Sequence, residues 1–117
     1  MRIATIGAAM LVAAGVAVPA QAQDPNYARN IAGTCTTCHG TEGRSVGGVP
    51  PSLAGQSKEY LVQALKDFKE GKRPSTTIMH QHAKGYTDEQ LELIAGYFSS
   101  IKAGPGAAAP AARGGSY

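Results

Sequence analysis

Apolar side chains recur at helical spacing in three segments of this chain, and the last segment shows the pattern most clearly. There Thr87 and Gln90 form a capping box, the side-chain pattern that starts many α-helices. The apolar positions that follow lie three or four residues apart: Leu91, Ile94, Ala95, Phe98 and Ile101. This spacing predicts an amphipathic helix with one face packed against the rest of the domain.

Two earlier helices are predicted in the same way. One covers residues 58–70, with Ser57 as its N-cap and Gly71 at its end. The other covers residues 26–34 and is entered through Pro25, a favourable first-turn residue. No stretch shows the alternation of apolar and polar residues that a strand would have. The chain is therefore predicted to be all-α.

The segments between these helices are predicted to be irregular. Residues 40–57 contain five glycines and two prolines, a composition typical of a loop. Residues 71–86 are also expected to form a loop. The last stretch, residues 104–117, is rich in glycine, alanine and proline, and we predict that it is disordered.

The first residues have the pattern of a secretory signal peptide. Arg2 precedes an uninterrupted apolar run over residues 6–18, and Ala20-Gln21-Ala22 is a small-residue cleavage site. The run is shorter than the roughly twenty residues that a retained membrane anchor would need. Cleavage would leave one domain, residues 23–103, followed by the tail, without a membrane span. The expected location is the periplasm.

Charge and size narrow the function further. The full chain has a net charge of +3 and no run of basic residues interleaved with aromatic residues, so nucleic-acid binding is not predicted. A domain this small buries limited apolar surface and usually needs disulfides, a metal or a cofactor for stability. The chain has two cysteines, which are too few for a disulfide framework.

Both cysteines lie beside a histidine in the motif Cys35-Thr-Thr-Cys38-His39. Two thiols at this spacing on a helical turn can reach both vinyl groups of a porphyrin, and the next imidazole can bind the iron, so the motif predicts one covalently attached haem c. A zinc site would need four ligands. A thioredoxin-like pair would need a strand-helix-strand setting, and a disulfide across two residues would be strained. Haem is the favoured interpretation.

Met79 is the only methionine outside the predicted signal peptide, and it lies among polar residues. A loop setting suits an iron ligand better than core packing, and a thioether raises the potential of haem iron. His80 and His82 are the rival ligands. Ligands on both sides would leave no open position on the iron, so the haem would transfer single electrons. A peroxidase or gas sensor would require Met79 to be absent or displaced.

The stretches CTTCHG, PPSLAG, FKEGKRPSTTIM and AKGYTDEQLELIAGYF resemble class I c-type cytochromes over residues 27–102. Within that class, the chain is most similar to the haem subunit of flavocytochrome c sulfide dehydrogenase. The second resemblance is to one half of the two-haem periplasmic cytochromes, whose second haem domain has no counterpart here. The TTIM stretch departs from the pattern of the family by an additional threonine ahead of Met79. The resemblance implies a small helical fold around one covalently bound haem.

The resemblance also implies roles for individual residues. Cys35 and Cys38 would form the thioethers to the haem. His39 and Met79 would be the two axial ligands of the iron. The carbonyl of Pro51 would accept a hydrogen bond from the His39 ring, and Leu53 would pack on the haem. Gly96 and Tyr97 would lie where the last helix crosses the first, with close backbone contact at Gly96.

The resemblance implies that the chain is an electron-transfer protein and not an enzyme by itself. Sulfide oxidation would belong to an FAD-containing flavoprotein partner, which passes electrons singly to the haem. The competing function is a free soluble carrier that donates to a terminal oxidase or reductase. Four basic residues lie along the end of the second helix and just after it: Lys66, Lys69, Lys72 and Arg73. They form either a docking patch for an acidic partner or, because Asp67 and Glu70 interleave with them, an ordinary solvated helix face.

Overall fold

The computed structural model describes residues 24–73 and 78–105. Its elements, in chain order, are α1 (Tyr27–His39), the short 3-10 helix η2 (Thr41–Gly43), α2 (Lys58–Lys69), α3 (Met79–Lys84) and α4 (Asp88–Ser100). The described residues contain no strand, so the all-α prediction is confirmed. The predicted signal peptide and the tail beyond residue 105 lie outside the described residues.

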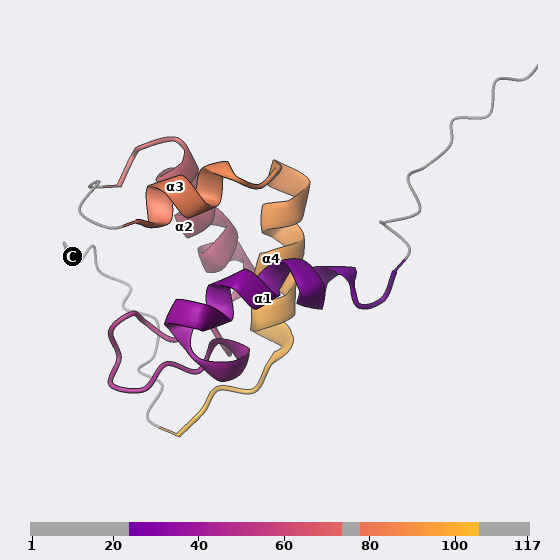
Figure 1. Ribbon diagram of the computed structural model, residues 1–117, viewed down its shortest axis with the longest axis vertical. Helices are drawn as coiled ribbons and strands as arrows, with labels where there is room; N and C mark the ends of the chain where they lie inside the picture. Colours follow the sequence, from indigo (N-terminus) through magenta and orange to yellow (C-terminus); the bar gives the residue numbers. More distant parts are fainter. Residues whose placement is uncertain (1–23, 74–77, 106–117) are drawn as a thin grey trace, which may run out of the picture.

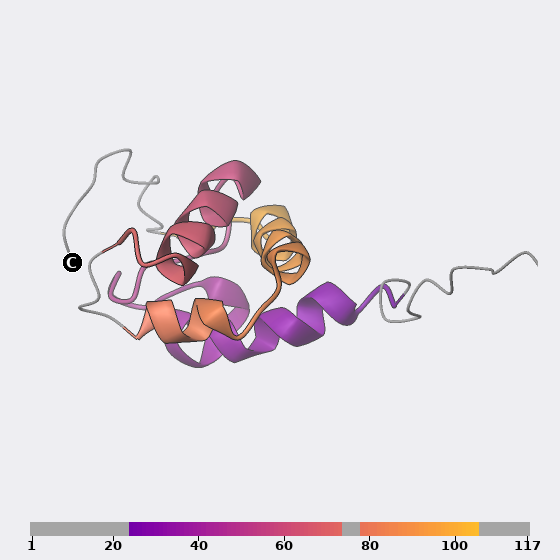
Figure 2. The same ribbon diagram turned by 90° about the horizontal axis from the view of Figure 1, so that it is seen from above.

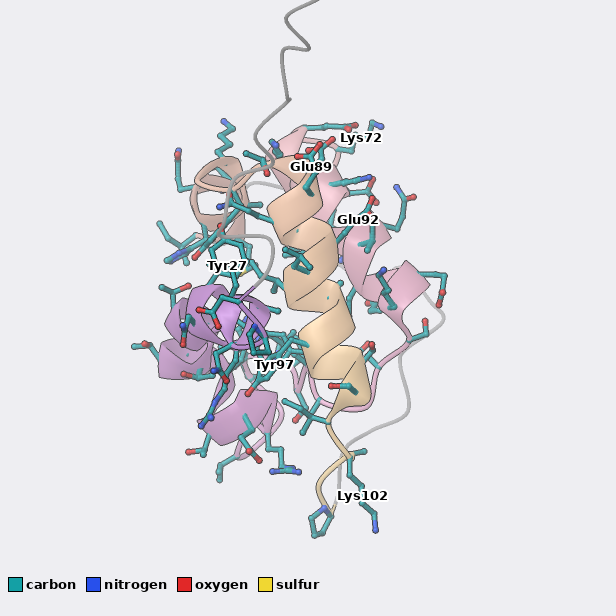
Figure 3. All side chains as sticks on the ribbon, turned by 90° about the vertical axis from the view of Figure 1, so that its right-hand side faces the viewer. Tyr27, Lys72, Glu89, Glu92, Tyr97 and Lys102 are labelled. Atoms are coloured by element: carbon teal, nitrogen blue, oxygen red, sulfur yellow. The ribbon has the colours of Figure 1, made fainter. Side chains whose placement is uncertain are left out.

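Helix α4 is central to the packing. It contacts both α1 and α2, and α3 packs against α2. Figure 1 shows α1 crossing α4, and Figure 2 shows α3 and α2 on the same side of α4. Seen from the right-hand side of Figure 1, α4 lies in front, with α1 to one side and α2 to the other (Figure 3). The three long helices therefore share one core.

The core is formed by the predicted apolar face of α4 together with residues of α1 and α2. Its buried cluster comprises Ala32, Leu61, Ile94, Ala95 and Phe98. Leu91 and Phe98 are the largest fully buried side chains among the described residues. Full burial of an apolar side chain of this size stabilises a fold by about 1.5–3 kcal/mol. The helical periodicity of the α4 sequence thus correctly predicted the main core positions of that helix.

The predicted starts of α2 and α4 are confirmed. The Thr87 and Gln90 capping box is complete, because each backbone N–H donates to the other residue's side-chain oxygen, at 2.9 and 3.2 Å. At the start of α2, the Ser57 hydroxyl oxygen accepts from the backbone N–H of Tyr60 at 3.2 Å. Gly71 follows the end of α2 with a φ of +73°, a conformation that glycine adopts readily.

Helix α1 is longer than predicted. It continues past residue 34 and ends at His39. The segment contains Gly33 and three threonines, residues of low helix propensity, which is why the local pattern indicated an earlier end. Burial of Ala32 and His39 favours the helix over its whole length. Tertiary packing therefore outweighs propensity here.

The prediction that residues 71–86 form only loop is wrong in part, because α3 lies within them. This helix has six residues, fewer than two turns, and no side-chain hydrogen bond at its N-cap. It buries one residue, Ala83, and packs on α2. So short a helix has too few positions to show a periodicity, and its stability comes from tertiary contact.

The close backbone contact predicted at Gly96 is not found. A Cβ atom at this position would lie 3.9 Å from Lys58 Cε, at ordinary contact distance. The fully buried small residues of the cluster are instead Ala32 of α1 and Ala95 of α4. The prediction for Tyr97 agrees with the structure, since its ring lies between α1 and α4 in Figure 3.

Candidate haem-binding site

The last turn of α1 carries both cysteines and the histidine of the motif. Cys35 is half-buried and packs against the core cluster, whereas Cys38 is exposed. Both are free thiols, not a disulfide. Burial raises the pKa of the Cys35 thiol, so the group is uncharged at neutral pH. The two thiols thus lie one helical turn apart, one at the protein interior and one at the surface.

His39 is the one buried polar residue in the described part of the chain, with 5% of its surface exposed. Its Nδ1 atom lies 2.6 Å from the carbonyl oxygen of Pro51. A carbonyl oxygen can only accept a hydrogen bond, so Nδ1 must carry the hydrogen and donate it. The lone pair of the neutral ring is then on Nε2. This is the tautomer that binds a metal through Nε2, with the ring orientation fixed from behind.

Glycines bring the Pro51 carbonyl to this position. Gly40 ends α1 directly after His39 with a φ of +82°, and a Cβ there would lie only 2.1 Å from the Arg44 carbonyl oxygen. The Gly43 carbonyl then accepts hydrogen bonds from the backbone N–H groups of Leu53 and Ala54, at 2.8 and 3.1 Å. These contacts fold the loop back onto the end of α1.

Leu53 lies at the inner edge of this loop, where its side chain packs against the buried cluster. A second loop contact is the hydrogen bond from the Ser45 backbone N–H to the Ser52 hydroxyl at 2.9 Å. Pro51 is therefore flanked on its C-terminal side by two residues whose positions are fixed. The predicted residues His39, Pro51 and Leu53 lie close together.

Met79 is the first residue of α3 and is half-buried. The residues before it, 74–77, lie outside the described residues. Of the rival ligands on the same helix, His82 is exposed and His80 is half-buried. The assignment of Met79 as the distal ligand stays a prediction.

The donor set fits a haem better than an isolated metal ion. Across residues 24–73 and 78–105, no three side chains from His, Cys, Asp and Glu are grouped as they would be around a metal ion. The end of α1 instead offers two free thiols and an imidazole whose Nδ1 is bound to the Pro51 carbonyl, which leaves Nε2 for a ligand. Such a set can form two thioethers and one axial bond to iron.

One cavity among the described residues borders the motif, and another lies away from it. The first, of about 310 Å³, is lined by Thr36 and Thr37 of the motif, by Arg29 and Gly33 of α1, and by Tyr97 of α4. Another, of about 320 Å³, lies between α2 and α4 near Lys58 and Glu92. Neither is lined by a predicted haem-binding residue, so neither is assigned to the haem.

The basic group at the end of α2 and just after it is largely neutralised. Lys66 pairs with Glu92 at 3.4 Å and Lys69 with Asp88 at 2.8 Å, and Glu92 lies on the α2 side of α4 in Figure 3. Lys72 pairs with Glu70. The guanidinium of the remaining member, Arg73, lies 5.0 Å from the centre of the Phe68 ring. These contacts favour the alternative of an ordinary solvated helix face over a docking patch.

Two residues connect the site to the rest of the fold in a way that the sequence did not indicate. They are Tyr86 and Lys69, of which Lys69 was assigned only to the basic group. The Tyr86 hydroxyl contacts α1, and the Lys69 ammonium contacts the Tyr86 carbonyl. Gly40 and Gly43 were assigned only to a loop, although a glycine directly after the histidine was a usable signal for the end of α1. No helix in the described part of the chain is long and apolar enough to cross a membrane.

A helical fold whose first helix ends in Cys-x-x-Cys-His, with the histidine ring buried and fixed by a proline carbonyl, defines a c-type cytochrome. Residues 25–102 match the family described as Cytochrome c, and the chain belongs to this family. It is an electron carrier, and the family binds its haem c covalently.

Three relatives illustrate the range of similar proteins. The chain is 53% identical over 68 residues to the cytochrome subunit of sulfide dehydrogenase from Chlorobaculum tepidum, over 58% of this chain and 60% of that protein. It is 40% identical over 70 residues to cytochrome c-554(548) of Halomonas halodenitrificans, over 58% of this chain and 84% of the relative. It is 39% identical over 79 residues to cytochrome c4 of Pseudomonas aeruginosa, over 68% and 39%. The chain thus spans less than two thirds of the first and third of these relatives.

Proposed function

We propose that the chain binds one haem c through thioethers to Cys35 and Cys38, with His39 and Met79 as the axial ligands. The single observation that carries this proposal is the hydrogen bond from His39 Nδ1 to the Pro51 carbonyl, because it directs the lone pair on Nε2 to a metal. The protein works in the periplasm, to which residues 1–22 direct it as a signal peptide.

The residues of the chain determine what such a haem can do. The haem supplies an iron that changes between two oxidation states. His39 and Met79 would hold the iron from both sides and would leave no site on it for substrate or oxygen. The thioether of Met79 would favour the reduced state and raise the potential. The protein would then exchange one electron at a time.

We propose further that the electrons come from an FAD-containing, sulfide-oxidising flavoprotein, with this chain as its cytochrome subunit. Similarity to the Chlorobaculum tepidum subunit supports this partner. Oxidation of sulfide releases two electrons as a sulfur–sulfur bond forms, and a flavin accepts such a pair, whereas this site accepts one. The chemistry on sulfide therefore belongs to the partner, and this chain removes electrons singly.

Exposed apolar side chains support a contact on the side of the motif. Val46 and Val49 are 95% and 77% exposed in the glycine-rich loop, and Ile78, 60% exposed, precedes α3. The loop, the end of α1 and the start of α3 lie on the same side of the molecule in two perpendicular views (Figures 1 and 2). Single exposed apolar residues are common, but three on one side favour a protein contact.

Reconstitution tests the partnership. The purified cytochrome is mixed with a sulfide-oxidising flavoprotein from the same source, sulfide is added, and reduction of the haem is followed by absorbance. We expect fast reduction and a complex that co-purifies with FAD. Val46→Asp and Val49→Asp should each weaken the complex by at least about tenfold. Leu93→Asp is the matched control, because Leu93 is an exposed apolar residue on α4.

A free soluble carrier is the second candidate function. It is favoured by the similarity to cytochrome c-554(548), of whose length the chain covers 84%. In that case no flavoprotein would accelerate the reduction of the haem by sulfide, and the cytochrome would exchange electrons with terminal oxidases or reductases instead. The same mixing experiment separates the two functions.

A further inference from the structure

Tyr86 lies in the connection between α3 and α4, and its side chain reaches back to α1. Its hydroxyl oxygen lies 2.6 Å from Thr34 Oγ1, and Thr34 directly precedes Cys35. Both hydroxyls also lie within hydrogen-bond distance of the Ile31 carbonyl oxygen, Thr34 at 3.3 Å and Tyr86 at 3.4 Å. The Tyr86 hydroxyl is therefore tied to α1 at two points, the Thr34 hydroxyl and the Ile31 carbonyl.

The backbone of Tyr86 is held by a second helix. Lys69 Nζ donates to the Tyr86 carbonyl oxygen at 2.8 Å and also contacts Asp88 Oδ1 at 2.8 Å. The Tyr86 ring packs against the core cluster. One residue is thus fixed by α1 through its hydroxyl and by α2 through its carbonyl.

Fixing Tyr86 also fixes α3. The Tyr86 backbone N–H donates to the Ala83 carbonyl at 3.3 Å, and Ala83 is 1% exposed, so the C-terminal end of α3 is continuous with this anchor. A six-residue helix is about 9 Å long and behaves as a short rod. Met79 lies at its other end. A shift at Tyr86 is therefore transmitted to Met79.

We propose that Tyr86 is a positioning residue for Met79. Its hydroxyl ties the segment that carries Met79 to the turn of α1 that carries Cys35, and so sets the distance between the two sides of the haem site. This inference rests on the proposed function, in which Met79 binds the iron. Removal of the hydroxyl should make Met79 easier to displace from the iron while leaving the proximal side with His39 intact.

Competition by imidazole measures this displacement. Imidazole is titrated into the oxidised holoprotein, and loss of the weak near-red sulfur-to-iron absorption band reports replacement of Met79. Tyr86→Phe should increase the apparent imidazole affinity about two- to tenfold, the change that loss of one intramolecular hydrogen bond typically gives. Thr34→Val removes the hydroxyl partner on α1 but leaves the contact of Tyr86 with the Ile31 carbonyl. It should therefore give a smaller increase in the same direction, and it serves as the test if Tyr86→Phe folds poorly.

Tyr27→Phe is the matched control. The Tyr27 hydroxyl accepts a hydrogen bond from Gln90 Nε2 at 2.8 Å, so it ties α1 to α4 without involving α3. Figure 3 shows Tyr27 on the α1 side of α4. Its loss should lower the free energy of unfolding, measured by circular dichroism in denaturant, by an amount similar to Tyr86→Phe. The imidazole affinity should stay at the wild-type value.

Two results would overturn the inference while leaving the proposed function in place. One is an imidazole affinity of Tyr86→Phe and Thr34→Val equal to that of the wild type. The other is an equal increase in Tyr27→Phe, which would trace the effect to general stability. A wild-type protein without the near-red band would instead refute Met79 as a ligand, and the inference would fall with it.

Discussion

Replacing Gly96 or Gly43 by alanine should change the stability of this domain in opposite directions. Gly96 lies inside α4, where a Cβ atom would be 3.9 Å from Lys58 Cε, its nearest neighbour. Alanine is more favourable than glycine inside a helix by about 1 kcal/mol. We therefore expect Gly96→Ala to raise the free energy of unfolding by about 1 kcal/mol, equivalent to roughly 4–8 °C in Tm for a domain of this size.

Gly43 presents the opposite case. Its φ is +74°, and a Cβ there would lie 2.7 Å from two carbons of the Phe98 ring and 3.2 Å from Leu53 Cβ. Phe98 is 1% exposed, so its ring has no free space into which to move. The left-handed conformation costs a residue other than glycine about 1–2 kcal/mol, and overpacking costs about 1–3 kcal/mol. Gly43→Ala should therefore lower the free energy of unfolding by about 2–5 kcal/mol.

Gly47 separates these two costs. Its φ is +86°, but no atom lies within 4 Å of a Cβ at this position. Gly47→Ala should lower the free energy of unfolding only by the cost of the left-handed conformation, about 1–2 kcal/mol. The assay is denaturant unfolding of the haem-loaded protein, followed by far-UV circular dichroism, with equal m-values as the check on comparability. A stable Gly43→Ala variant, or a destabilised Gly96→Ala variant, would contradict the packing of α4 described above.

Three further predictions concern the site and its surroundings. Haem staining after denaturing electrophoresis should colour the wild-type band but not a Cys35→Ala, Cys38→Ala double variant; haem that acidified organic solvent extracts from the wild type would contradict thioether attachment. Met79→Ala should abolish the near-red band and lower the reduction potential, and a band that persists would exclude Met79 as the ligand. The hydrogen bond from Lys69 lowers the pKa of Asp88, so this pair stabilises the fold above about pH 4 and loses its effect as the pH falls through the lower, folded pKa. Asp88→Asn should accordingly reduce the loss of denaturant midpoint between pH 5 and pH 2, and an unchanged pH profile would show that the pair has no effect.

The parts of the fold predicted correctly from the sequence are those that local chemistry determines. Ser57 and Thr87 start α2 and α4 through contacts within four residues, and the apolar face of α4 follows from helical spacing alone. The end of α1 depends on burial of His39 by a loop twelve residues further on, which no local pattern contains. Helix α3 depends on packing against α2, and it is too short for its own sequence to indicate it.

The candidate site divides in the same way. The motif itself predicted Cys35, Cys38 and His39, because the spacing follows from the dimensions of a porphyrin. The contact between His39 and Pro51 was implied only by the resemblance. It requires the loop to fold back through the carbonyl of Gly43, and no local pattern predicts that. The contacts of the Tyr86 hydroxyl link residues more than fifty positions apart, and periodicity carries no information on such pairs.

These contacts hold the two sides of the proposed haem site by different means. His39 ends a thirteen-residue helix, is buried, and has its ring held by the Pro51 carbonyl. Met79 begins a six-residue helix that packs on α2 and is joined at its other end to Tyr86. An electron carrier needs a coordination that changes little between oxidation states, so both sides must be held. In this chain a loop carbonyl orients the proximal ring, and the tie between Tyr86 and α1 adds to the packing of α3 on α2 on the distal side.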